Sequence, residues 1–263
     1  MKLILRFWVL LFFAPYITIA QPVTQLSFQI VDQQSQDRDA FVQGLAFDQS
    51  HLYLGTGGYG SSYVAKINPS TGNTIVQESL PARYFGEGVT VLRNLLYQLT
   101  WRSGTGFIRD RETLQVIEQF RIAGEAWGIT NDGTNLIVSN GSASLTFYTP
   151  EGIKPVRSIT VTEEGRRIKR LNELEYIDGL VWANIWYEDR VVVINPQSGE
   201  VVASLNLEGL LPRKERLPNT DVLNGISYDA TNDSVWFTGK RWPWRYQLEI
   251  LPERPKFLPT EPQ

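Results

Sequence analysis

A pattern that recurs five times constrains the fold of this chain more than any other feature of its sequence. Each copy contains a polar or aromatic residue, then a glycine or leucine, an apolar stretch, a turn and a second apolar run. The copies read QGLAFDQSHLYLGTG, EGVTVLRNLLYQLTW, WGITNDGTNLIVSNG, ELEYIDGLVWANIW and NGISYDATNDSVWFTGK. Their anchor residues, separated by steps of 44, 40, 46 and 51, are Gly44, Gly88, Gly128, Leu174 and Gly225. One structural unit is therefore used five times.

Each unit continues into a third apolar run, a turn such as PSTG or PQSG, and a fourth run such as IVQESL. Units of three or four short strands that repeat every 40 to 51 residues are typical of the blades of a β-propeller. No apolar period of 3.6 residues is sustained, so little helix is expected. We predict an all-β chain and, more specifically, a five-bladed β-propeller. The alternative is a β-sandwich whose segments resemble one another by coincidence.

The first twenty residues have the pattern of a secretory signal peptide. A short positive start precedes an almost wholly apolar run at 7–19, and Ala20 provides a small residue before the cleavage point. A run of this length is short for a stable membrane span. We expect an exported protein, periplasmic or secreted; the alternative is an uncleaved N-terminal anchor. The predicted organisation is a signal peptide at 1–20, a repeat domain at 21–251 and a Pro-rich extended tail at 252–263.

Composition excludes several classes of function. Removing Lys2 and Arg6 from the 25 basic residues leaves 23 against 28 acidic residues, a net charge of −5. A mildly acidic chain without a basic stripe does not favour nucleic acid. The chain has no cysteine, which excludes thiolate chemistry, and its one histidine, His51, lies in a predicted turn. A zinc site or a Ser-His-Asp triad is therefore hard to build. We expect a monomer that leaves the membrane after cleavage.

Two sets of repeat-equivalent positions carry unlike residues, although packing alone would favour similar ones. The position before each anchor holds Gln43, Glu87, Trp127, Glu173 and Asn224. The position about 13 residues after each anchor holds Gly57, Trp101, Gly141, Trp186 and Lys240. If the repeats are related by rotation, both sets converge at one end of a central channel. We predict a site there, with the three tryptophans forming an aromatic pocket, although a single Trp most often packs in a core.

Glu87 is the candidate for proton transfer. It lies two residues after Phe85, so the two share one side of an extended segment. An apolar neighbour raises the pKa of a carboxyl by desolvation, which suits it to acid–base chemistry near neutral pH. A glutamate that caps a turn or pairs with arginine is an equally good interpretation of this motif alone.

Oxygen-bearing side chains also permit a cation site in the channel. Glu87, Asn172, Glu173, Glu175 and Asn224 together would supply the ligands of a calcium cage. Hydrogen bonds between repeats are the commoner role for such residues. We expect no cofactor, with a structural calcium as the alternative.

Eight segments in order resemble the plant and bacterial type of glutaminyl-peptide cyclotransferase. They are FVQGLAF, YFGEGVTVL, LYQLTW, GEAWGIT, LNELEYIDG, VWANIW, DVLNGISYD and VWFTGK, and they run from about Phe41 to Lys240. The resemblance implies a five-bladed propeller that acts on peptides or proteins with N-terminal glutamine, releases ammonia and uses no metal in the chemistry. A channel calcium is known in the plant type.

The resemblance also implies the site residues. The catalytic set would be Glu87, Asn172 and Lys240. The substrate-binding set would be Phe41, Gln43, Phe85, Trp101, Trp127 and Trp186. This sequence departs from the family at Val42, Ala126 and Asn140, where Thr, Gly and Asp are usual. None of these changes removes a functional group from the site, although Ala126 would shift Trp127 slightly.

The expected reaction is an intramolecular acyl transfer, in which the substrate amine attacks its own side-chain carbonyl. Glu87 would move the proton, Gln43 would orient the amide, and indole N–H groups with Asn172 or Lys240 would stabilise the oxyanion. Aromatic walls would exclude water. The rival functions are a non-catalytic propeller that binds a peptide or glycan, and a calcium-dependent propeller hydrolase.

Overall fold

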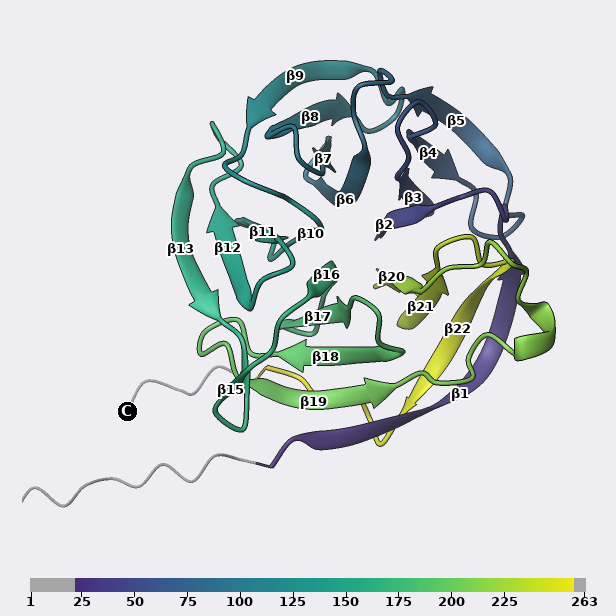
Figure 1. Cartoon of the computed structure of the whole chain (residues 1–263), viewed down its shortest axis with the longest axis vertical. Coiled ribbons are helices and arrows are strands. Elements are labelled where there is room, and N and C mark those ends of the chain that lie inside the picture. Colours follow the sequence, from purple (N-terminus) through teal and green to yellow (C-terminus); the bar gives the residue numbers. More distant parts are fainter. Residues whose placement is uncertain (1–21, 258–263) are drawn as a thin grey trace, which may run out of the picture.

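The computed structural model describes residues 22–257 as an all-β molecule whose sheets surround a central axis (Figure 1). The expected signal peptide and the end of the tail, 258–263, lie outside the described residues. Within 22–257 the one helical element is the 3-10 turn η1 (Arg213–Glu215). The prediction of an all-β chain with scarce helix is confirmed. No helix in this range is long and apolar enough to cross a bilayer.

Three of the sheets have four antiparallel strands each, in chain order. The first contains β2 (Val42–Asp48), β3 (His51–Thr56), β4 (Tyr63–Ile67) and β5 (Thr74–Ser79). The second contains β6 (Gly86–Leu92), β7 (Leu95–Thr100), β8 (Thr105–Asp110) and β9 (Val116–Arg121). The third contains β10 (Ile129–Asn131), β11 (Leu136–Ser139), β12 (Ser144–Tyr148) and β13 (Pro155–Thr160). Each begins at one copy of the repeat.

An eight-stranded sheet takes up the last two copies of the repeat. One half contains β16 (Leu171–Ile177), β17 (Leu180–Ile185), β18 (Arg190–Ile194) and β19 (Val201–Asn206). The other half contains β20 (Leu223–Asp229), β21 (Ser234–Gly239), β22 (Trp244–Leu251) and β1 (Thr24–Ser35). A small hairpin, β14 (Thr162–Glu163) and β15 (Arg166–Arg167), precedes the first half.

Strand β1 closes the ring of sheets. It pairs antiparallel with β22, where Ser27 faces Leu251, and parallel with β19, where Thr24 faces Ala203. The first described strand thus lies between β22, the last described strand, and β19 of the preceding unit, on the outside of the ring (Figure 1). The repeat pattern did not predict this pairing, because the segment before Phe41 contains no copy of the repeat.

The five innermost strands, β2, β6, β10, β16 and β20, converge on the axis (Figure 1). The anchor glycines lie where their backbones come closest. A Cβ atom on Gly44 would be 2.4 Å from the backbone nitrogen of Val89, and one on Gly128 would be 2.0 Å from the carbonyl oxygen of Asn172. No side chain fits at such a distance, so glycine is required by the approach of neighbouring backbones.

Four of these innermost strands contain a register shift near the end that reaches the site. The shifts fall between Val42 and Gly44, Gly86 and Val89, Leu171 and Leu174, and Leu223 and Ile226. A bulge re-aims the side chains within it and is over-represented beside active sites. The residues inside these shifts include Gln43, Glu87, Asn172 and Asn224.

The described part of the Pro-rich tail is docked on the domain, whereas the sequence suggested only an extended segment. Arg254 forms ion pairs with Asp178, at 3.1 Å, and with Asp233. The backbone N–H of Phe257 donates to the carbonyl of Asp178 at 2.9 Å. Residues 252–257 therefore cover the turn between β16 and β17.

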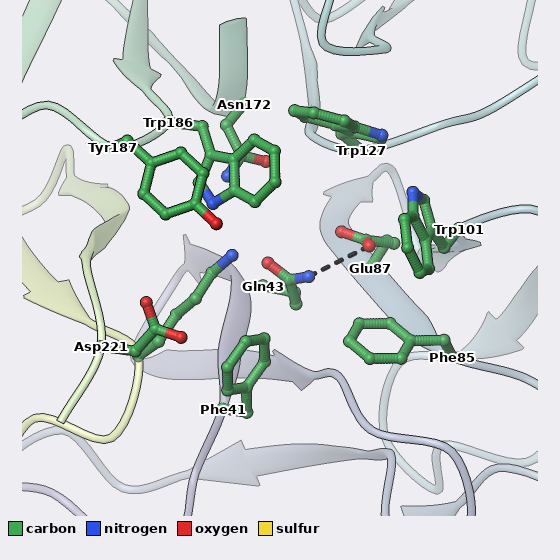
Figure 2. A pocket seen from close by; sticks show the side chains of 11 residues that line it. Phe41, Gln43, Phe85, Glu87, Trp101, Trp127, Asn172, Trp186, Tyr187 and Asp221 are labelled. Atoms are coloured by element: carbon green, nitrogen blue, oxygen red, sulfur yellow. Dashed lines mark hydrogen bonds between the residues drawn. The ribbon is translucent and has the colours of Figure 1, made fainter. Parts of the chain in front are cut away.

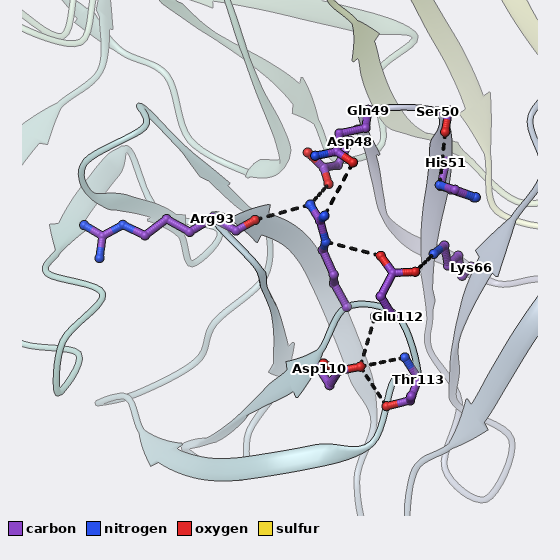
Figure 3. A network of polar contacts seen from close by, with 10 residues as sticks. Asp48, Gln49, Ser50, His51, Lys66, Arg93, Asp110, Glu112 and Thr113 are labelled. Atoms are coloured by element: carbon purple, nitrogen blue, oxygen red, sulfur yellow. Dashed lines mark hydrogen bonds and ion pairs between the residues drawn. The ribbon is translucent and has the colours of Figure 1, made fainter.

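A polar network joins the first sheet to the second (Figure 3). The ammonium of Lys66, whose side chain is 4% exposed, pairs with Glu112. Arg111 reaches Asp48 at 2.8 Å and the second oxygen of Glu112 at 3.3 Å. Glu112 thus compensates a buried cation and a neighbouring arginine at once, and its pKa is lowered first by the hydrogen bond from Lys66.

We expect Glu112→Ala to lower the free energy of unfolding by about 1–3 kcal/mol, because it leaves the buried Lys66 without its acceptor. Urea denaturation at neutral pH measures the loss. The control is Glu118→Ala, which removes an exposed glutamate of β9 that forms no ion pair with other described residues. Equal effects of the two substitutions would contradict a stabilising role for the network.

Candidate active site

One pocket of about 280 Å³ brings together all nine site residues that the sequence predicted (Figure 2). Its lining consists of Phe41, Gln43, Phe85, Glu87, Trp101, Trp127, Asn172, Trp186, Tyr187, Asp221 and Lys240. Every one of the five repeats contributes at least one of these side chains. Sequence reasoning missed Tyr187, which directly follows Trp186, and Asp221, which precedes β20 and belongs to no repeat-equivalent position.

Glu87 is a buried carboxyl with one oxygen unused. Its side chain is 3% exposed, and burial raises its pKa well above the ordinary value, with Lys240 opposing the rise and Glu125 adding to it. Its Oε1 accepts a hydrogen bond from Nε2 of Gln43 at 3.0 Å. Its Oε2 has no hydrogen-bond partner among the described residues. The group can therefore hold or accept a proton at a pH where an exposed glutamate stays ionised.

Gln43 is held from both sides. Its amide nitrogen donates to Glu87, and its amide oxygen accepts from Nδ2 of Asn224 at 3.4 Å. The same Nδ2 donates to the carbonyl of Val42 at 3.0 Å. Asn224, predicted at the position before the fifth anchor, therefore orients Gln43 and does not itself line the pocket.

A single carboxylate fixes two of the tryptophans. The indole N–H of Trp101 and that of Trp127 both donate to Oε2 of Glu125, at 2.9 and 3.1 Å. Arg102 donates to the other oxygen of Glu125 at 2.9 Å and lies over the Trp101 ring at 3.7 Å. The structure does not support the expectation that these two indoles stabilise an oxyanion, because both N–H groups already donate to Glu125. A signal for Glu125 existed in GEAWGIT, two residues before Trp127.

The two glycines of the second predicted set make room for aromatic rings. A Cβ on Gly57 would lie 2.3 Å from the ring of Phe85, and one on Gly141 would lie 2.4 Å from the ring of Trp127. The lack of a side chain at these two positions leaves the space that the rings occupy. The same repeat-equivalent position thus holds a bulky residue of the pocket wall in one unit and a glycine in another.

Lys240 and Asn172 are the candidate donors that remain, together with Trp186. Lys240 is 3% exposed, and its ammonium lies 4.9 Å from the centre of the Phe41 ring and 5.9 Å from that of Trp186. Burial lowers the pKa of Lys240, while Glu87 opposes that change. Asn172, at the shift in β16, is 2% exposed and faces the same pocket. The amino group of Lys240 and the amide of Asn172 therefore lie in the pocket with the Glu87 carboxyl.

Glu173, predicted at the position before the fourth anchor, lies outside the pocket lining. Its two oxygens accept backbone N–H groups of Leu45, at 3.3 Å, and Ile226, at 2.9 Å, so it joins β16 to β2 and β20. The bulge in β16 explains the difference, because it places Asn172 rather than Glu173 toward the pocket. Hydrogen bonding between repeats is thus its role.

The neighbouring acid has the same kind of partners. Glu175 accepts the backbone N–H of Tyr228 at 2.9 Å and the hydroxyl of Thr130 at 3.4 Å, and burial raises its pKa to about 8. No cluster of three or more His, Asp or Glu suited to a metal occurs within 22–257. Since the carboxylates of Glu173 and Glu175 already accept protein donors, they do not fit a calcium cage of six to eight free oxygen ligands.

We expect Glu125→Ala to alter the near-UV circular dichroism of the tryptophans while the far-UV spectrum is kept, because Trp101 and Trp127 lose their shared acceptor. Burial alone would raise the pKa of Glu125, but hydrogen bonds from Trp127, Arg102 and Trp101 lower it. Acidification of the wild type should therefore reproduce the change only below the usual glutamate range. An unaltered near-UV spectrum of the variant would contradict the positioning role.

The comparisons with known proteins agree with this site. The family model of glutamine cyclotransferase matches residues 7–250. The chain is 36% identical over 228 residues to a glutaminyl-peptide cyclotransferase of Arabidopsis thaliana, covering 84% of this chain and 71% of that protein. The crystal structure of Myxococcus xanthus glutaminyl cyclase aligns with a TM-score of 0.81 at 30% identity, covering 88% of this chain and 98% of the other. This chain is a member of the glutamine cyclotransferase family.

Proposed function

We propose that the chain is a glutaminyl-peptide cyclotransferase, which converts N-terminal glutamine of peptides or proteins to pyroglutamate and releases ammonia. The observation that carries this proposal is the buried Glu87 carboxyl, one oxygen unused, in an aromatic pocket with Lys240 and Asn172. In the reaction, the α-amino nitrogen forms a bond to the side-chain amide carbon. The bond from that carbon to its own nitrogen then breaks.

Glu87 moves one proton between these two nitrogens. Its carboxylate takes the proton that the attacking amine must lose and delivers it to the amide nitrogen, which leaves as ammonia. No proton is gained or lost overall, so one group can serve both steps. The raised pKa supports this role, because a carboxyl matched to the working pH both accepts and returns a proton.

The oxyanion that forms on the amide carbon requires donors that the protein has not already used. Lys240, Asn172 and the indole N–H of Trp186 are the candidates in the pocket, since Trp101 and Trp127 donate to Glu125. Donors held in place beforehand stabilise developing charge without reorganisation. The aromatic walls exclude water and so limit hydrolysis of the amide.

We propose a five-bladed β-propeller as the architecture of residues 21–251, with 252–263 as a tail. The eight-stranded sheet is then two blades, β16–β19 and β20–β22 with β1, joined where β1 pairs with β19. The support is the fivefold sequence repeat and the five innermost strands around one axis (Figure 1). In this arrangement the N-terminal strand fills the outer place of the last blade.

We expect Glu87→Gln to lower kcat by at least about 100-fold, because an amide cannot carry the proton. The substitution keeps the shape of the side chain and a partner for Gln43, so the melting temperature should stay near that of the wild type. Ammonia release from a peptide beginning with glutamine measures the rate. Glu118→Gln is the matched control on an exposed strand. A variant with wild-type turnover would remove Glu87 from the mechanism.

We propose that the chemistry is independent of metal ions. The support is the donor set: the chain has no Cys and one His, and Glu173 and Glu175 accept hydrogen bonds from other elements. Activity should therefore survive prolonged dialysis against EDTA. Loss of activity in a protein that stays folded, with recovery on adding calcium or zinc, would instead support a metal-dependent enzyme.

We also propose that the protein is exported and that cleavage after Ala20 exposes Gln21 as an N-terminal substrate. Thr24 is already paired with Ala203 in the outermost strand, so a tether of three residues spans roughly 10 Å at most. Three strand spacings of about 4.8 Å separate the outermost from the innermost strand. Cyclisation of Gln21 by the enzyme must therefore occur between two molecules.

Intact mass spectrometry of the exported protein should show the loss of one ammonia relative to free Gln21. Purified wild-type enzyme added to exported Glu87→Gln protein should increase the cyclised fraction, because the reaction is intermolecular. An unchanged fraction would mean that Gln21, which precedes Pro22, is not a substrate. A different N-terminal residue would place the cleavage site elsewhere.

A further inference from the structure

Tyr187 lines the pocket and yet has no part in the reaction described above. Its side chain is 62% exposed, and its ring stacks on Trp186 with centroids 4.2 Å apart and planes inclined by 28°. No hydrogen bond from its hydroxyl to another described residue is present. A large aromatic side chain at the mouth of a pocket, with a free hydroxyl, is typical of a binding surface.

The backbone at Tyr187 is strained. Its φ is 69°, in the left-handed region, as it is for nine other non-glycine residues of the described chain. The repeat provides an internal comparison, since the equivalent turn positions after Gly57 and Lys240 also have positive φ. They hold Gly58, at 125°, and Arg241, at 59°. The turn can thus be made by residues without an aromatic ring, so the backbone alone does not require tyrosine at this place.

Tyr187 belongs to an outer rim of side chains, each resting on one wall of the pocket. Tyr59 contacts Phe85 with ring centroids 5.5 Å apart, Arg102 lies over Trp101, and Arg241 lies 5.4 Å from the centre of the Phe41 ring. Arg102 is committed to Glu125 through an ion pair. Tyr187 differs from Arg102 because its hydroxyl forms no hydrogen bond with another described residue.

The depth of Glu87 in the pocket determines what must lie against this rim. The first residue of a substrate must reach Glu87, which is 3% exposed, whereas Tyr187 is 62% exposed at the mouth of the pocket. The rest of a peptide substrate leaves through the mouth, attached by the carbonyl of its first residue. The second residue of the substrate therefore passes directly over the rim.

We propose that Tyr187 is the specificity-determining residue for the second position of the substrate, where its exposed ring stacks on an aromatic or large apolar side chain. This inference rests on the proposed cyclotransferase function. Aromatic pairs of this kind contribute modestly, so the selectivity is a matter of severalfold preference rather than exclusion.

The test compares kcat/KM for two peptide amides, Gln-Phe-Ala and Gln-Gly-Ala, with wild type, Tyr187→Asn and Tyr187→Phe. The wild type should prefer the Phe peptide by roughly threefold to tenfold. Tyr187→Asn should lose this preference, mainly through a higher KM for the Phe peptide, and Tyr187→Phe should keep it. An unchanged ratio in Tyr187→Asn would overturn the proposal. If the wild type cyclises neither peptide, the proposed function itself fails.

A second measurement separates substrate recognition from a structural role. Asparagine adopts the left-handed region more readily than tyrosine, so Tyr187→Asn relieves strain while it loses the stacking on Trp186. The melting temperature of the free enzyme should therefore stay the same or rise. A clear fall in melting temperature, together with equal losses for both peptides, would make Tyr187 a packing residue and overturn the proposal.

Discussion

The close approach of the innermost backbones is the constraint on which the rest of this molecule depends. Glycines such as Gly44 and Gly128 allow successive inner strands to meet without side chains between them. In four of the five units the register of the innermost strand also shifts near the pocket, and each shift contains a residue of the pocket or of its support. Gln43, Glu87 and Asn172 reach a common pocket for this reason. The position of the site therefore depends on how the innermost strands meet at the centre of the molecule.

Burial of acids near the axis has two different outcomes. Glu173 receives a backbone N–H on each of its oxygens, which compensates for the loss of water and joins neighbouring units. Glu87 receives one donor only and keeps a second oxygen unpartnered. The same residue type is thus structural in one unit and chemically available in another. The difference comes from the donors around it, since both side chains are almost fully buried.

Much of this arrangement could be predicted from the sequence because it repeats. The anchor residues marked the innermost strands, and the residues beside them, with the resemblance, selected all nine predicted members of the pocket. The bulge in β16 could not be predicted, since alternation along a regular strand does not say whether Asn172 or Glu173 faces the pocket. Glu125 and Tyr187 were missed for another reason. They lie in turns, where contacts depend on the path of the backbone rather than on a period.

The pairing of β1 with β22 has a consequence for how the chain folds. Ser27 and Leu251 are 224 residues apart, so this pairing joins the first and the last of the described strands. During synthesis β1 is made long before β22, its antiparallel partner. Until then β1 has an unpaired edge, which is the feature that makes a strand prone to associate with other chains. Such long-range pairing is also slow to form. Folding of this sheet is therefore completed only once β22 is available, and the interval before that is when β1 is most exposed to aggregation.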